Sequence, residues 1–232
     1  MALQAPEFTG TKRTPQAALE AGSYPARIAR VIDLGLQPTT DFNTKQPGKP
    51  VHKISVTYEL VDAFMLDDDG NELEDKPRWV PEDFSLLPLK SDRATSTKRM
   101  LAIDPKGTLK GDWSQALGMP CSVVLIQYET KKNPGVIRNK VDNVTTIRPR
   151  DAANMADLQN DAKFFDLSDP DVEFFNSLPS WQQDVIKSNL EYAGSVLEAR
   201  LGGTPEPKKD EPAKKAAPAP EVADDEDEDA PW

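Results

Sequence analysis

Five stretches of alternating apolar and polar residues constrain this 232-residue chain more than any other feature. They cover residues 22–35, 52–61, 78–85, 120–128 and 136–147. A period of two predicts strands that bury one face. In the first stretch the apolar set that includes Ala26 and Ile28 slips out of phase at Val31, which predicts a β-bulge near Ala29–Arg30.

A segment of helical composition, residues 91–102, separates the third strand from the fourth. Three strands, a helix and two more strands make the strand plan of the OB-fold, a five-stranded Greek-key barrel. Closure of the barrel would protect the edges of such short strands. We therefore expect a mainly β chain in which residues 22–150 form a five-stranded OB-fold barrel.

The segments that flank the expected barrel differ from it in composition. Residues 1–21 are predicted to be a mobile N-terminal arm, and residues 151–203 a helical extension. Within the extension, Ser180 and Gln183 have capping-box spacing. They precede an apolar stripe that predicts one helix to Leu201, formed by Ile186, Leu190, Ala193 and Leu197. Residues 204–232 have no periodicity, which predicts a disordered acidic tail.

The scarcity of cysteine and histidine, and the lack of long apolar runs, disfavour several classes of protein. One cysteine, Cys121, excludes an internal disulfide, and one histidine, His52, argues against His-based catalysis and His-rich metal sites. No apolar run is long enough to span a membrane, and no secretory signal is evident. We therefore predict a non-enzymatic protein without cofactor or metal in a reducing, cytoplasmic compartment.

One acidic motif has the start of a calcium-loop pattern. The spacing Asp67-x-Asp69-x-Asn71 matches its first positions, but Glu72 stands where such a loop needs glycine. A hairpin turn is the better interpretation of this segment.

Charge is unevenly distributed along the chain, whose net charge is −11. Residues 86–110 hold six basic and two acidic residues, and residues 130–150 hold six basic and one acidic. If these stretches converge in the fold, one face is positive although the whole chain is negative. The alternative is that they are two solvated loops.

Aromatic residues lie in or beside the basic stretches. A positive groove lined by rings on which bases stack is the usual way to bind single-stranded nucleic acid. The stacking candidates are Trp79, Phe84, Trp113 and Tyr128. The cationic candidates are Arg27, Arg30, Lys49, Lys53, Lys90, Lys98, Arg99, Lys131, Lys132, Arg138 and Lys140.

The acidic tail ends on an aromatic residue, which a purely solubilising tail would not need. Its last residues are Asp224, Asp225, Glu226, Asp227, Glu228, Asp229, Ala230, Pro231 and Trp232. The acids can compete with nucleic acid for a basic groove, and the terminal aromatic with its carboxylate can dock on a partner protein.

This tail resembles that of bacterial single-stranded-DNA-binding proteins, which ends in acids, a proline and a phenylalanine; here Trp232 replaces the phenylalanine. The opening strand, residues 22–35, is similar to the first strand of small phage replication proteins. The resemblance implies an OB-fold that coats single-stranded DNA without sequence preference in phage replication, recombination or repair. It also implies a tail that recruits a polymerase, a helicase–primase or a nuclease.

From these observations we expect a single-stranded-DNA-binding protein that does not associate with membranes and can self-associate. Two other classes remain open. One is a protein-interaction module that binds no nucleic acid, and the other is a binder of double-stranded DNA or of RNA.

Overall fold

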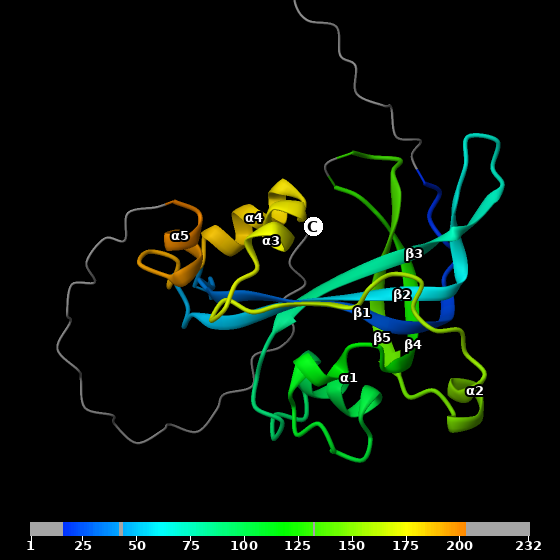
Figure 1. The fold of residues 1–232 in the computed structure, drawn as a ribbon, viewed down its shortest axis with the longest axis horizontal. Coiled ribbons are helices and arrows are strands. Elements are labelled where there is room, and N and C mark those ends of the chain that lie inside the picture. Colours follow the sequence, from blue (N-terminus) through cyan, green and yellow to red (C-terminus); the bar gives the residue numbers. More distant parts are fainter. Residues whose placement is uncertain (1–15, 42–43, 132, 203–232) are drawn as a thin grey trace, which may run out of the picture.

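The computed structural model describes residues 16–41, 44–131 and 133–202, whose arrangement is drawn in Figure 1. The strands are β1 (Gly22–Gln37), β2 (Val51–Leu66), β3 (Glu72–Ser85), β4 (Pro120–Glu129), β5 (Ile137–Thr145) and β6 (Lys163–Phe165). The helices are α1 (Thr95–Ile103), α2 (Pro149–Ala153), α3 (Val172–Ser177), α4 (Ser180–Lys187) and α5 (Val196–Arg200), with a 3₁₀ turn at Trp113–Ala116. None of the described helices is long and apolar enough to cross a membrane.

The strands form one sheet in the order β3-β2-β1-β4-β5, with all neighbours antiparallel, and β6 adds a short parallel pairing to β1. This confirms the expected mainly β fold, with a helix between the third and fourth strands. Among the described residues no hydrogen-bonded ladder joins β3 to β5, so the sheet is open between its two end strands. We call this opening the β3–β5 seam.

The predicted bulge in β1 is confirmed, because the pairing of β1 with β2 shifts between Ile28 and Arg30. Its effect is to divide the buried residues of one strand between two cores. Ala26, Ile28 and Val31 belong to the first core, whereas Ile32 and Leu34 belong to the second. A bulge changes which side chains of a strand point to a given face. Because of this change, the 16 residues of β1 contribute buried side chains to both cores.

The first core lies between the strands and α1. It contains side chains from all five antiparallel strands together with Met100 and Ile103 of α1. Figure 1 shows α1 below the sheet, opposite the β2–β3 and β4–β5 hairpins.

The hairpin turn expected at Asp67 is present, since the Asp67 carboxylate accepts the N–H groups of Asp69 and Asn71.

The second core joins β1 to the C-terminal helices. Ile32 and Leu34 pack with Phe165 of β6 and with residues of α3, α4 and α5. Gly35 lies at this contact with φ at +76°, and a side chain there would meet Asn189. Glycine therefore provides both the left-handed backbone and the close approach that this packing requires.

The single helix expected from residue 180 to residue 201 is wrong. The structure has α4 and α5 instead, separated by a segment in which Gly194 has φ at +74°. Leu190 is 54% exposed, and its N–H donates to the carbonyl of Leu36 in β1. The expected capping box is also absent, because the Gln183 amide donates to the carbonyls of Asn176 and Leu178.

Candidate nucleic-acid interface

Two of the four aromatic residues expected to stack on bases lie in the first core. Phe84 and Trp113 are each 6% exposed, and their ring centroids are 5.3 Å apart. Rings packed in this way have no free face for a base. The structure therefore corrects the prediction for these two residues. Phe84 lies on the inner face of β3, and Trp113, in the 3₁₀ turn after α1, packs its ring into the same core.

Trp79 of β3 has a different environment, because it is half-buried on the outer face of the sheet. Its indole N–H donates to Oε2 of Glu59 over 2.8 Å, and the guanidinium carbon of Arg30 lies 4.2 Å from its ring centroid. Burial lowers the pKa of Arg30, which also lies 5.5 Å from the ring of Phe174. A cation over one ring face and a hydrogen bond at the ring edge hold the indole in one orientation.

Two of the predicted cationic residues are engaged in holding the fold together. Arg27 donates to the carbonyls of Gly118, Met155 and Ala156, and it lies 3.2 Å from a carboxylate oxygen of Asp157. Its guanidinium therefore fixes the segment after α2 against β1, so it has little capacity left for a phosphate.

Arg99 of α1 is 5% exposed and makes a forked contact with Glu82 of β3. The same guanidinium donates to the Asn143 side chain and the Asp142 carbonyl of β5. Burial would lower the pKa of Arg99, but the hydrogen bonds and charge of Glu82 outweigh it and raise this pKa. Arg99 thus connects β3 to β5 from inside and does not face a ligand.

The remaining predicted cations occupy three separate parts of the molecule. Lys49 and Lys53 lie at the β1–β2 loop and the start of β2, and Lys90 and Lys98 lie in the loop before α1 and on α1. The third group follows the β4–β5 hairpin and contains Tyr128, Lys131, Arg138 and Lys140, with Tyr128 paired to Arg138 across the two strands. The structure therefore does not bring all the basic residues into one trough.

Lys132 and the whole acidic tail, Asp224, Asp225, Glu226, Asp227, Glu228, Asp229, Pro231 and Trp232, lie outside the described residues. The predictions for them stay predictions.

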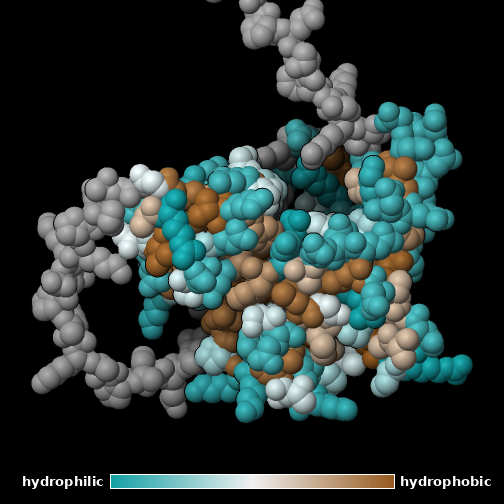
Figure 2. Space-filling view, viewed as in Figure 1, coloured by the Kyte–Doolittle hydropathy of each residue, from teal (hydrophilic) through white to brown (hydrophobic). Residues whose placement is uncertain are grey.

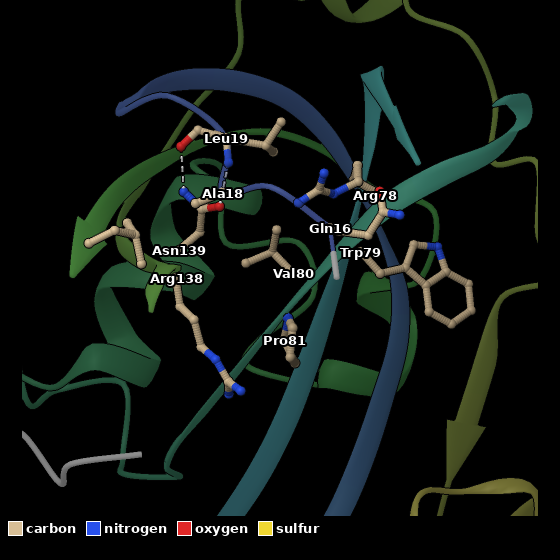
Figure 3. A pocket seen from close by; sticks show the side chains of 10 residues that line it. Gln16, Ala18, Leu19, Arg78, Trp79, Val80, Pro81, Arg138 and Asn139 are labelled. Atoms are coloured by element: carbon tan, nitrogen blue, oxygen red, sulfur yellow. Dashed lines mark hydrogen bonds between the residues drawn. The ribbon is translucent and has the colours of Figure 1, made fainter. Parts of the chain in front are cut away.

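A pocket of about 220 Å³ lies at the β3–β5 seam. It brings Arg138 of β5 together with Arg78 and Trp79 of β3, as Figure 3 shows. Arg138 extends across the seam toward Pro81, while the ring of Trp79 points away from Arg138 to the other side of β3. Arg78 was not among the predicted site residues; its position beside Trp79 in the sequence was the only available signal.

Residues 16–20 cross this seam, and we call them the seam strap. The N–H and carbonyl of Leu19 bond reciprocally with the side-chain amide of Asn139, both over 2.8 Å, and Gln127 also donates to the Leu19 carbonyl. Arg78 donates to the carbonyl of Ala17. The predicted mobile arm therefore ends in residues that are held against β3, β4 and β5, and its first 15 residues lie outside the described part of the chain.

The described residues show no cluster of three or more His, Cys, Asp or Glu side chains that could hold a metal ion. Cys121 is fully buried, and burial together with the charge of Glu82 raises the pKa of its thiol to about 12. His52 bonds to Asp33 over 2.6 Å at the edge of a pocket of about 290 Å³ that is lined mainly by polar and acidic side chains. None of these features forms a nucleophile–base pair.

No protein-family model matches this sequence, and no curated protein sequence matches it.

Proposed function

We propose that this chain binds single-stranded DNA without sequence preference in phage DNA replication, recombination or repair. We propose further that its strands form an OB-type barrel, with the β3–β5 seam as the side along which the strand is bound. Arg99 and the seam strap bridge this seam from inside and outside, which supports a rolled sheet although no β3–β5 ladder is present among the described residues.

The observation that carries the proposal is the convergence of Arg78 and Arg138 from two different strands in one pocket. Tyr128 lies opposite Arg138 on the neighbouring strand, whereas Trp79 lines the pocket with its ring directed to the other side of β3. Guanidinium groups attract phosphates, and half-exposed rings offer faces to bases whatever the sequence. A non-specific strand binder needs these two chemistries on one surface.

The direct test is a fluorescence-anisotropy titration of labelled oligo-dT at low salt. The full chain should bind, and binding should weaken steeply as salt rises because phosphate contacts release counterions. Arg138→Ala should weaken binding and reduce the salt slope by about one unit. Lys106→Ala, which removes an exposed charge after α1, is the matched control and should change little. Absence of binding by the full chain at low salt would overturn the proposal.

The acidic tail enters the proposal as a competitor for the same surface and as a recruiter of replication proteins. A chain that ends at residue 204 should bind oligo-dT more tightly than the full chain, because a competing polyanion is removed. Equal affinity of the two chains would contradict the competing role of the tail. Excess double-stranded DNA or RNA added as competitor distinguishes the other nucleic-acid classes, since it should displace oligo-dT poorly.

A protein-interaction module is the second candidate, and a specific surface favours it. Leu87, Leu89 and Leu101, in the loop before α1 and on α1, are 40%, 42% and 52% exposed. Figure 2 shows hydrophobic side chains gathered on this side of the molecule. If oligo-dT does not bind and Leu101→Glu abolishes capture of a partner protein, this candidate replaces the first.

A further inference from the structure

The attachment of the seam strap to the sheet differs from strand pairing. Its contacts with β3, β4 and β5 are made by side chains of the strands to main-chain atoms of the strap, and no strand pairing is present in residues 16–20. At its other end the Gln16 amide bonds reciprocally with the main chain of Leu66, over 3.0 and 2.8 Å. Figure 1 shows this dark blue segment between the two hairpins.

The strap occupies polar groups that face the seam. Asn139 uses both ends of its amide on Leu19, Gln127 uses its N–H₂ on the same carbonyl, and Arg78 uses one guanidinium nitrogen on Ala17. Figure 3 shows Leu19 and Asn139 joined by two bonds on one wall of the pocket. A guanidinium and two amides are also groups that bind phosphate and sugar oxygens of a nucleic-acid strand.

The apolar part of the attachment is small. Ala18 and Leu19 are half-buried, while Ala17 and Glu20 are exposed. Each hydrogen bond to water-accessible main chain contributes little net free energy, because water replaces it when it breaks. The strap is therefore held by exchangeable polar contacts and by one half-buried apolar side chain, Leu19, which packs against the first core.

We propose that the seam strap is a built-in competitor of the DNA strand and is displaced from the β3–β5 seam when single-stranded DNA binds. This inference rests on the proposed function, because the displacing ligand is the DNA strand. Release of the strap frees Arg78, Asn139 and Gln127 beside Arg138, so a site with one exposed guanidinium becomes a site with two guanidiniums and two amides. The freed guanidinium and amides can bind phosphate and sugar oxygens, which are the same at every nucleotide, so these contacts carry no sequence requirement.

The test is hydrogen–deuterium exchange of the full chain with and without saturating oligo-dT. The N–H of Leu19 donates to Asn139, so peptides that cover residues 16–21 should exchange faster when the oligonucleotide is bound. Unchanged or slower exchange in a complex whose formation is shown by anisotropy would overturn the inference and leave the proposed function standing. Failure of the full chain to bind oligo-dT overturns the proposed function and this inference together.

A pair of glutamine variants gives a second readout. Gln16→Ala removes both bonds to Leu66 without changing any strand-side group, and it should tighten oligo-dT binding by about fivefold, the equivalent of one net hydrogen bond. Gln46→Ala, the same substitution at an exposed position of the loop between β1 and β2, is the matched control, with affinity unchanged. Thermal unfolding establishes that both variants are folded. Weaker binding by folded Gln16→Ala would show that the strap assists the ligand and would contradict the proposal.

Discussion

At the scale of single residues, Glu59 shows how hydrogen-bond donors satisfy a buried carboxylate. The side chain is 2% exposed, and its carboxylate accepts N–H groups from the Trp79 indole, the Gln159 main chain and the Asn160 amide. Buried carboxylates are costly unless such donors surround them. Glu59 thereby holds the segment after α2 against β2 and orients the indole of Trp79.

Glu59→Ala should lower the free energy of unfolding by roughly 2–4 kcal/mol, because three part-buried donors lose their acceptor. Urea denaturation followed by circular dichroism measures this loss. Glu72→Ala, at an exposed position of β3, is the control and should change stability little. Equal stability of the two variants would show that the Glu59 network is not a stabilising feature.

Asp83 gives a pH-dependent prediction. Burial raises the pKa of this carboxyl group above its ordinary value of 3.8, and the charge of Lys53 only partly opposes this. The folded chain then keeps the proton to higher pH than the unfolded chain, so ionisation of Asp83 reduces stability as pH rises through the folded-state pKa. Asp83→Asn should therefore gain stability over the parent as pH rises from 3.8 toward neutrality.

Urea midpoints of parent and variant across that pH range test this directly, since the difference between them isolates Asp83 from the other carboxyl groups. Asp75→Asn, exposed on the same strand, serves as the control. A difference that does not change with pH would contradict the prediction.

At the scale of elements, the β3–β5 seam is held by connections that are not strand pairing. Arg99 reaches from α1 to Glu82 on β3 and to Asn143 on β5. Glu82 also accepts a bond from the hydroxyl of Tyr58, whose pKa is raised by burial and by the charge of Glu82. The helix between the third and fourth strands thus contributes a guanidinium that ties together the two ends of the sheet.

Arg99→Ala should cost about 3–5 kcal/mol of unfolding free energy, because it leaves the Glu82 carboxylate buried without its partner. The double variant Arg99→Met with Glu82→Gln should recover much of that loss, since the uncompensated charge is then absent. Denaturation of both variants, with Lys98→Ala of the same helix as control, measures the two effects. A double variant no more stable than Arg99→Ala would argue against the charge as the cause.

At the scale of the whole molecule, one strand serves two cores. Ile32 and Leu34 of β1 are each 1% exposed only because the C-terminal helices cover them, and Arg27 of β1 binds the segment that leads to those helices. The segments on the two sides of the boundary expected at residue 150 therefore pack against each other and bury a common apolar surface. The C-terminal unit completes the sheet and is not a simple appendage.

A fragment of residues 16–150 should expose Ile32 and Leu34 and should aggregate or bind a hydrophobic dye. The same fragment with Ile32→Gln and Leu34→Gln should remain more soluble, because the exposed apolar patch is removed. Size-exclusion chromatography and dye fluorescence distinguish the two. An unmodified fragment that elutes as a monomer with the melting temperature of the full chain would show that residues 22–150 fold independently.

Local pattern alone determined the order of the five long strands, the helix between the third and fourth, and the bulge in β1. These follow from backbone geometry, because alternation with period two and its phase slips are properties of neighbouring residues. The start of β3 at Glu72 and the three-residue strand β6 carry no such signal, since polar or very short strands are specified by their partners.

Only the tertiary structure decided what the candidate site residues do. Trp79 and Trp113 have the same side chain and each lies within three positions of a basic residue, yet one is half-exposed on the outer face and the other is sealed in the core. Likewise Arg99 is buried against Glu82, whereas Arg138 is exposed in the seam pocket, and in both cases the neighbours are distant in sequence. Whether a cation or a ring can meet a ligand depends on burial and on partners from other strands, and neither quantity is encoded by the residue type or its local spacing.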